Sequence, residues 1–379
     1  MNLSVGIIGL PNVGKSTLFN ALLKKQQAFV ANYPFATIEP NVGVVPVPDP
    51  RLEKLADIVA GDPSPASGGL RTNRPPVIPA TVRFVDIAGL VRGASEGAGL
   101  GNKFLSHIRE VSIICDVVRA FEDQNVIREG SVDPKSDYET IQTELILADL
   151  QSLAKSKAIS HKTPSILSSI DGKKREVVEK INSSLNRGIP VRDMELSEDE
   201  KEVIKPLFLL SAKPEIVVLN VSEKDYSEAK LYDIIRHYKG LLKLREEKFV
   251  VISAKIEAEL ADLSEEDQGQ YLKDLGLKQS GLERLITKAY QALDLIYFLT
   301  AGEKEVRAWT IRRGTSALRA SGTIHTDFEK AFIKAEVVSY DEFIQNNGWK
   351  GARENGKVRL EGRGYIMQDG DVVEFKIGS

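Results

Sequence analysis

The sequence is poor in the residue types that build metal centres and covalent cross-links. Its 379 residues include one cysteine, Cys115, which excludes a disulfide scaffold and a cysteine-rich zinc module. The four histidines are too scattered to indicate a metal cluster by spacing: His107, His161, His237 and His325. A zinc enzyme is therefore a poor first hypothesis.

Long hydrophobic runs and a large excess of either charge are also lacking. No apolar run approaches the roughly 20 residues that a membrane-spanning helix needs. The first residues carry no basic segment, so we expect no signal peptide and a cytoplasmic protein without membrane contact. The 51 Lys and Arg nearly balance the 54 Asp and Glu, so nucleic-acid binding would need a local patch, and we expect no DNA partner.

Five short apolar runs bounded by Gly, Pro or polar residues are typical of buried strands. They span residues 5–8, 82–87, 113–118, 216–220 and 249–252. Their β-branched residues do not alternate with polar ones, which is the pattern of a parallel sheet covered on both faces. Helical patterns lie between the runs, as in residues 15–23, so the sequence predicts an α/β fold.

Residues 133–205 have the wrong character for a unit of this α/β core. Two apolar stripes at helical spacing, within 141–153 and 177–185, predict an inserted antiparallel helical hairpin. Ser197 and Glu200 have the spacing of a capping box, which predicts another helix where the chain returns. A solvated insertion without chemistry is favoured here over a specific docking arm.

Two other segments have a different composition. Residues 61–80 are rich in Gly, Pro and Ser and predict a long surface loop. From about residue 301, short alternating runs are separated by turns such as Asn347-Gly348. The C-terminal part is therefore predicted to be a small, mostly β domain with one helix near 326–332.

The strongest motif follows the first apolar run and fits G-x-x-x-x-G-K-[ST]: Gly9-Leu10-Pro11-Asn12-Val13-Gly14-Lys15-Ser16. Glycines let the backbone curl so that N–H groups and a helix N-terminus face phosphate oxygens. Lys15 is expected to reach the β and γ phosphates, and the Ser16 hydroxyl to bind Mg²⁺. A chance glycine-rich turn is the alternative. The candidate phosphate-binding residues are Asn12, Val13, Gly14, Lys15, Ser16 and Thr17.

A second element delivers an acidic residue near the end of a predicted strand. Asp86 is followed by Gly89 at Asp-x-x-Gly spacing. The Asp86 carboxylate can hold the water shell of Mg²⁺, and the Gly89 N–H can contact a γ-phosphate. Alone, such an Asp is often only a turn initiator. The glycine-rich segment 91–102 then predicts a switch ordered by the γ-phosphate, with an ordinary flexible loop as the alternative.

Four segments together carry a resemblance that covers essentially the whole chain. They are 9–16, Asn32-Tyr33-Pro34-Phe35-Ala36-Thr37, Asp86-Ile87-Ala88-Gly89-Leu90-Val91, and Thr300-Ala301-Gly302-Glu303-Lys304-Glu305-Val306-Arg307-Ala308-Trp309-Thr310. In these segments the sequence closely resembles the YchF or Obg-like ATPase family. The resemblance implies a GTPase-type P-loop NTPase domain, an inserted α-helical hairpin and a C-terminal, mostly β TGS domain with a ubiquitin-like fold.

The resemblance also implies a division of the chain and a switch residue. We expect a nucleotide-binding domain at 1–132 and 206–300, a helical insertion at 133–205 and a TGS domain at 301–379. Thr37 would be the switch threonine that joins Mg²⁺, the implied cofactor, to the γ-phosphate. From the residues alone, a Thr in a Pro-bounded loop is equally a turn residue.

Base recognition departs from that of ordinary GTPases. Where they have Asn-Lys-x-Asp, the strand 215–219 ends in Asn220-Val221-Ser222-Glu223. The longer Glu223 displaces the carboxylate, which leaves guanine donors unpaired and predicts binding of ATP, with GTP also accepted. Ser253-Ala254-Lys255 resembles the last base-contacting loop, so we expect Ser253 and Ala254 at the purine. A strand-terminating turn is the alternative for 220–223.

Hydrolysis needs a group that orients water. Leu90 occupies the position where many GTPases have Gln, and leucine cannot orient water by hydrogen bonding. Asn12 resembles the asparagine that binds K⁺ in potassium-activated relatives, so K⁺ is a second candidate cation. Arg128 stands where related proteins often carry a histidine, with a solvated surface arginine as the alternative. The candidate catalytic residues are Lys15, Gly89 and Arg128.

A local basic cluster lies in the C-terminal region. Arg312, Arg313 and Arg319 flank Gly314-Thr315 and could bind RNA phosphates, although ordinary surface arginines are the alternative. The resemblance to TGS domains favours contact with the ribosome or ribosomal RNA, with the helical insertion as a second contact. We therefore predict a slow Mg²⁺-dependent ATPase whose nucleotide state controls ribosome association. A conventional GTPase, an RNA-binding or ribosome-binding module with negligible turnover and a metabolic P-loop kinase are the alternatives.

Overall fold

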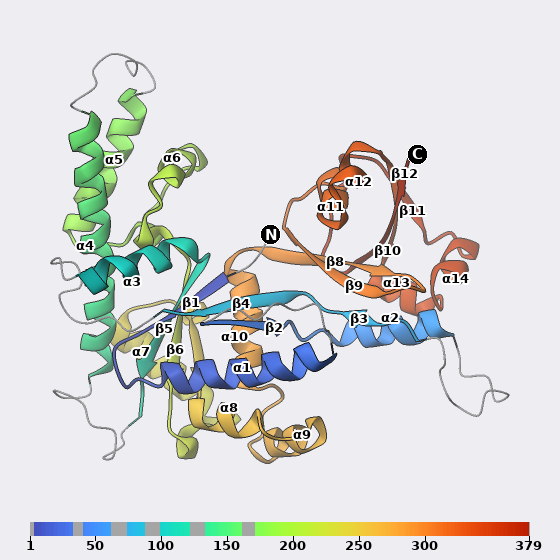
Figure 1. Cartoon of the computed structure of the whole chain (residues 1–379), viewed down its shortest axis with the longest axis horizontal. Helices are drawn as coiled ribbons and strands as arrows, with labels where there is room; N and C mark the ends of the chain where they lie inside the picture. The colour runs from blue at the N-terminus through green and yellow to red at the C-terminus, as the bar shows by residue number, and fades with distance from the viewer. Residues whose placement is uncertain are drawn as a thin grey trace. The chain divides into compact units, whose positions relative to one another are not determined.

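A computed structural model of the chain describes residues 4–32, 41–61, 74–87, 99–121, 133–160 and 171–378 (Figure 1). The chain divides into two compact units. The first unit contains residues 3–45 and 83–289, and the second contains residues 1–2, 46–82 and 290–379. Within the described ranges, no helix is both long enough and apolar enough to cross a membrane.

The first unit is built on a six-stranded sheet with the order β2-β4-β1-β5-β6-β7. Its strands are β1 (Ser4–Ile8), β2 (Val42–Pro46), β4 (Thr81–Asp86), β5 (Ile113–Arg119), β6 (Glu215–Asn220) and β7 (Phe249–Ile252). From β4 through β7 in this order, neighbouring strands pair in parallel. Every residue of β5, β6 and β7 is buried, which explains why these strands are apolar without alternation. The five predicted strands are confirmed, whereas β2 was not predicted.

The first unit also contains helices, two of which, α4 and α5, form the predicted hairpin. The helices are α1 (Lys15–Asn32), α3 (Gly99–Glu110), α4 (Pro134–Ser160), α5 (Asp171–Asn186), α6 (Glu198–Ile204), α7 (Glu228–Leu242), α8 (Ala254–Leu260), α9 (Glu265–Asp274) and α10 (Gly281–Ala292). Figure 1 shows α4 and α5 lying side by side. Ile146 and Leu153 of α4 pack with Val177 and Ile181 of α5, so the two apolar stripes face each other. The capping box at the start of α6 is also present.

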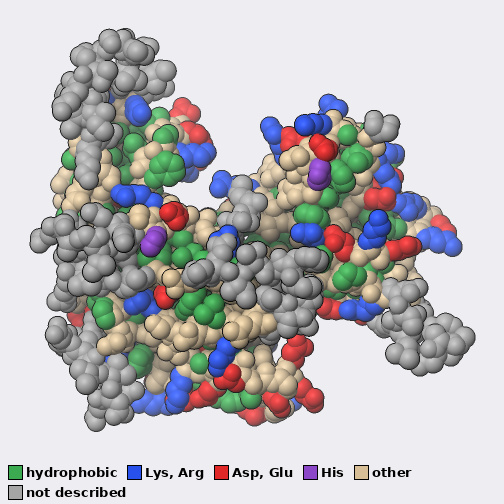
Figure 2. Space-filling model, in the orientation of Figure 1, with side chains coloured by type: hydrophobic (Ala, Val, Ile, Leu, Met, Phe, Trp, Pro, Cys, Tyr) green, Lys and Arg blue, Asp and Glu red, His purple; other side chains and the backbone are tan. Residues whose placement is uncertain are grey.

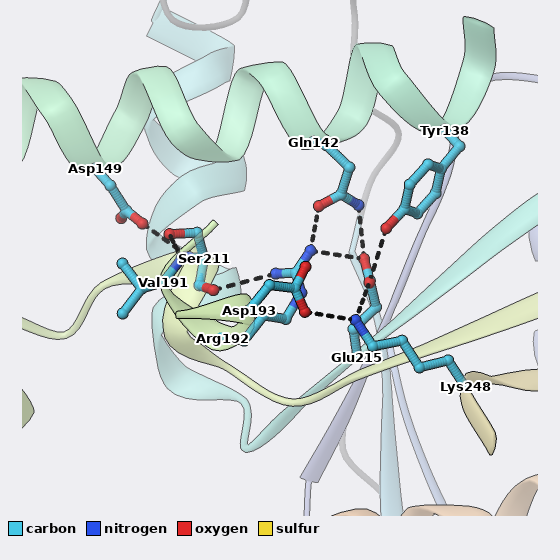
Figure 3. Close-up of polar contacts among 9 residues, drawn as sticks. All are labelled: Tyr138, Gln142, Asp149, Val191, Arg192, Asp193, Ser211, Glu215 and Lys248. Carbon is cyan, nitrogen blue, oxygen red and sulfur yellow. Dashed lines mark hydrogen bonds and ion pairs between the residues drawn. The ribbon is translucent and has the colours of Figure 1, made fainter. Parts of the chain in front are cut away.

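A buried ion pair ties the hairpin to the sheet (Figure 3). Glu215, the first residue of β6, pairs at 3.0 Å with Arg192 of the 3-10 turn η3 (Val191–Asp193). From α4, the Tyr138 hydroxyl and the Gln142 side-chain amide also donate to Glu215, at 3.0 and 2.6 Å. The Arg192 guanidinium in turn donates to the carbonyl oxygen of Ser211 at 3.3 Å. Buried charges need such partners, so this cluster fixes the base of the insertion.

The second unit has its own six-stranded sheet, with the order β11-β10-β12-β8-β9-β3. Its elements are α2 (Pro50–Ala60), β3 (Val77–Ile78), β8 (Leu295–Ala301), β9 (Val306–Arg312), α11 (Ala317–Ile324), α12 (Thr326–Lys330), β10 (Phe332–Ser339), α13 (Tyr340–Gln345), α14 (Trp349–Glu354), β11 (Arg359–Glu361) and β12 (Asp371–Ile377). Apolar residues of α11 pack against this sheet, including Ala317 and Ala320. The mostly β character is confirmed, but the C-terminal part contains α11, α13 and α14 besides the one helix expected.

Two expectations from the sequence differ from the structure around residues 46–82. The stretch 61–80 is not entirely loop, because Val77 and Ile78 form β3 and pair in parallel with Val306 and Arg307 of β9. Residues 46–82 and 290–300 also join the second unit, although we expected them in the nucleotide-binding domain. A strand of two residues carries no periodic signal, and its partner is far away in sequence.

We predict that Arg192→Met lowers the free energy of unfolding by about 3 kcal/mol, because Glu215 then keeps a buried charge without its main partner. Arg175→Met is the matched control. Its exposed pair with Glu179 on α5 should contribute no more than about 0.5 kcal/mol. Urea unfolding followed by circular dichroism measures both values. Equal losses in the two variants would show that the buried pair has no special weight.

Candidate functional site

The predicted phosphate loop lies at the carboxyl end of β1 and leads into α1. Gly9 and Gly14 have φ angles of 149° and 101°, and Asn12 has a φ of 61°. A side chain at Gly9 would also place its Cβ 2.7 Å from the carbonyl oxygen of Val117 in β5. The loop therefore has a conformation that favours glycine at its two glycine positions and tolerates asparagine between them.

Lys15 lies across this loop. Its side chain is buried, and Nζ donates a hydrogen bond of 2.7 Å to the carbonyl oxygen of Leu10. Burial lowers the pKa of Lys15, and the attraction of Asp86 and Asp116 only partly offsets it. A buried ammonium group with a lowered pKa gains from a nearby anion, so the loop suits phosphate.

Two of the groups expected at Mg²⁺, Ser16 and Asp86, lie at the same edge of the sheet. Ser16 is exposed in the first turn of α1, as is the expected phosphate contact Thr17, and Asp86 ends β4 directly opposite Ile7 of β1. Burial raises the pKa of Asp86, while the charge of Lys15 lowers it. Hydroxyl and carboxylate oxygens are ligands that Mg²⁺ prefers.

The described residues contain no group of three or more His, Cys, Asp or Glu side chains that could hold a metal. A Mg²⁺ ion that shares its coordination with phosphates and water needs fewer protein ligands. The oxygen donors Ser16 and Asp86 therefore fit a nucleotide-bound Mg²⁺.

Asn220 connects the phosphate loop to the predicted base-contacting loops. It ends β6, and its side chain is 4% exposed. Its Nδ2 donates to the carbonyl oxygen of Val13 at 2.9 Å, and its Oδ1 accepts from the Ala254 N–H at 2.9 Å. Asn220 therefore positions both loops, and both ends of its side-chain amide are used within the protein.

Val221 and Glu223 have different environments, although both were expected at the base. Val221 is buried in an apolar cluster with residues such as Val118 and Tyr226, so its side chain does not cover a base. Its N–H donates to the carbonyl oxygen of Ile252 at 2.8 Å. The Glu223 side chain is 46% exposed and forms an ion pair of 2.7 Å with Lys255. Glu223 is therefore the expected base contact whose carboxylate reaches the surface.

Sequence reasoning missed two features of this site. The first is the pairing of Glu223 with Lys255, which could have been found from opposite charges on two loops expected to meet. The second is Asp116, a fully buried carboxyl in β5 beside Ile8 of β1. Burial raises the pKa of Asp116 well above its usual value, and Lys15 acts in the opposite direction. Its only signal was an acidic residue inside an apolar run.

Some of the positions singled out in the sequence lie outside the described residues. They are Thr37, Gly89, Leu90 and Arg128. Ser253, the other predicted purine contact, is buried directly before α8. The structure therefore brings together the phosphate loop, Asp86 and the loops after β6 and β7.

Comparison with known proteins gives matches to both ends of the chain. A family model described as a 50S ribosome-binding GTPase matches residues 4–152. The YchF-GTPase_C model, described as a protein of unknown function, matches residues 295–378. Each match lies where the sequence motifs indicated a GTPase-type domain and a TGS domain.

Full-length relatives extend the similarity over the whole chain. Proteins named Ribosome-binding ATPase YchF are 44% identical in Bacillus subtilis, over 99% of both chains, and 48% identical in Haemophilus ducreyi, also over 99% of both. The solved structure of the Schizosaccharomyces pombe YchF GTPase is 38% identical, with a TM-score of 0.84, and covers 99% of this chain and 98% of its own. This similarity spans both units and the insertion, so the chain belongs to the YchF family.

Proposed function

We propose that this chain is a Mg²⁺-dependent nucleoside triphosphatase that hydrolyses ATP, and GTP as a second substrate, and whose nucleotide state controls its binding to the ribosome. The observation that carries the proposal is the curled loop at 9–16, with Lys15 buried across it and Asn220 fixing it to the base side. The relatives in Bacillus subtilis and Haemophilus ducreyi are named Ribosome-binding ATPase YchF, which supports the same conclusion.

The phosphate end follows from the geometry of the loop. Backbone N–H groups at the start of α1 would bind phosphate oxygens, and the Lys15 ammonium would stabilise charge on the transferred phosphoryl group. Ser16 and Asp86 would hold Mg²⁺, with Thr37 as a further ligand. Bound there, the ion supplies electrostatic stabilisation of the phosphate charge.

The group that stabilises the developing phosphoryl charge is proposed from the sequence alone. Leu90 offers no polar side chain to orient water, so we assign the charge stabilisation to K⁺ that the Asn12 side chain would hold, with Arg128 as the competing group. Asn12 has a left-handed backbone conformation, which supports a specialised role for this position of the loop. Turnover without the ribosome should therefore be slow.

On the base side, the arrangement supports ATP as the main substrate. Glu223 is one carbon longer than the Asp that reads guanine in ordinary GTPases, and it is paired with Lys255. The two N–H donors of guanine would have to compete with Lys255 for this carboxylate. Adenine does not depend on a carboxylate that accepts two hydrogen bonds.

The ribosome contact is proposed to involve the second unit and the helical insertion. In the arginine cluster, Arg313 pairs with Asp294 at 2.9 Å, and Arg319 pairs with Glu329, so their charges are partly compensated. Arg312 is exposed at the end of β9. On the face of the molecule that Figure 2 draws, basic and acidic side chains are intermingled, which supports a local contact rather than a broad basic surface.

We expect Lys15→Ala to lower kcat/KM for ATP about a hundredfold or more, because its charge acts on the phosphates in the transition state. Lys24→Ala is the control, since Lys24 lies on the same helix but pairs with Asp262 at the surface. Steady-state phosphate release measures both variants. Undiminished turnover in Lys15→Ala would contradict the assignment of the phosphate loop.

We predict that Glu223→Asp raises the GTP-to-ATP affinity ratio about fivefold, because it shortens the side chain and weakens the pairing with Lys255. Position 221 is kept as Val, because a lysine there would place an ammonium group in an apolar cluster. Glu246→Asp, at the opposite end of β7, is the control. Calorimetric titration with both nucleotides tests this, and an unchanged ratio would place base specificity elsewhere.

Charge reversal at Arg312 should weaken ribosome binding about threefold to tenfold and reduce its salt dependence. Arg245→Glu changes the net charge equally but lies in the first unit, beside Glu247, and serves as the control. Co-sedimentation with ribosomes at several salt concentrations measures the effect. If the two variants bind equally well, Arg312 is not part of the contact.

A further inference from the structure

A buried carboxylate lies next to the loops that follow β6 and β7. Glu257 belongs to α8, which begins at Ala254 directly after β7, and it is 1% exposed. Its Oε1 accepts from the Gly281 N–H at 2.7 Å and from the Tyr226 hydroxyl at 3.0 Å. Its Oε2 accepts from the Leu282 N–H at 3.3 Å. Glu257 thus connects α8, the segment after β6 and the start of α10.

The charged form of Glu257 has a physical reason to persist at this place. The first N–H groups of a helix lack partners within the helix, and a carboxylate there interacts favourably with the helix dipole. Burial raises the pKa of Glu257, while the N–H groups of Gly281 and Leu282 and the Tyr226 hydroxyl stabilise the ionised form. An ionised carboxylate accepts hydrogen bonds only, which matches three donors around its two oxygens.

Tyr226 extends this support to the strand that leads into the other loop. It ends the loop that starts at Asn220, and its side chain is fully buried. Its hydroxyl also accepts from the Arg284 guanidinium at 2.9 Å, which in turn donates to the carbonyl oxygen of Val251 in β7 at 2.9 Å. Through Tyr226, the loop after β6 is therefore bonded to α8 directly and to β7 by way of Arg284.

The packing around Gly281 leaves no room for a Cβ atom. A side chain at Gly281 would place its Cβ 2.7 Å from the Tyr226 hydroxyl and 2.9 Å from Ile252 Cγ1. From α1, Lys25 also reaches the start of α10 at Ser280, with a hydrogen bond of 3.4 Å. A displacement of Glu257 would therefore be passed on to its bonded neighbours, which include Tyr226 at the end of the loop after β6.

We propose that Glu257 is a positioning residue for purine recognition. It holds the segment 220–226 against the segment 252–257, so that Glu223 and the loop at Ser253 face one base. Only one residue lies between Glu257 and Lys255, the partner of Glu223, and Tyr226 is three residues beyond Glu223. The inference rests on the proposed nucleotide-binding function and adds a residue that does not itself touch the nucleotide.

A purely structural role would give a different result. If Glu257 only stabilised α10, its substitution would lower the stability of the fold and would affect all ligands of the folded protein alike. A positioning role affects only ligands that carry a base. Tripolyphosphate engages the phosphate loop without a base, so the affinity for ATP relative to tripolyphosphate separates the two roles.

The test is Glu257→Gln in the full chain, with Mg²⁺ present and folding checked by circular dichroism. Its amide nitrogen donates where an acceptor is needed, so at least one bond to Gly281, Leu282 or Tyr226 is lost. We expect ATP to bind about tenfold more weakly in calorimetry, while tripolyphosphate affinity stays within about twofold. Glu259→Gln, at an exposed carboxylate on the same helix, should leave both affinities unchanged.

Tyr226→Phe removes one donor and should shift the same ratio by about threefold, so it decides the matter if Glu257→Gln does not fold. Equal weakening of ATP and tripolyphosphate, or no change in either, would overturn the positioning role alone. Failure of the unaltered chain to bind ATP would instead overturn the proposed function, and this inference with it.

Discussion

The nucleotide side of the structure depends on the side-chain amide of Asn220. It is bonded to the carbonyl oxygen of Val13, 207 residues away, and to the N–H of Ala254, 34 residues away. Buried backbone groups must be paired, and this one side-chain amide pairs with both the carbonyl oxygen of Val13 and the N–H of Ala254. Loss of this amide would leave a donor and an acceptor unpaired and would free the phosphate loop from the base-contacting loop.

Strand β6 gives this amide a fixed position. All of its residues are buried, and it lies between β5 and β7 in the sheet. Its other end is Glu215, which holds Arg192 and the Tyr138 hydroxyl at the base of the helical insertion. The insertion and the nucleotide side are therefore attached to opposite ends of the same six-residue strand.

Periodicity in the sequence predicted the parallel strands and the hairpin, because both have long apolar patterns. It could not predict β3, whose two residues become a strand only by pairing with β9. The phosphate loop and Asp86 were predicted because a short motif fixes their chemistry. The burial of Val221 was not predicted. An apolar residue at the position of a base-covering Lys can face either the core or the ligand, and the sequence does not distinguish the two. Such outcomes depend on tertiary packing rather than on local sequence.

Burial divides the site residues into two groups with different tasks. Lys15, Asn220 and Glu257 are buried, and each is bonded to a backbone group of a neighbouring segment. Ser16 and Glu223 are exposed and can meet a ligand directly. The exposed pair of Glu223 with Lys255 contributes little in water, and it would strengthen where a bound base excluded solvent. Under the proposed function, specificity for the base depends on how the buried group places the two loops before the ligand arrives, because exposed charges alone discriminate weakly.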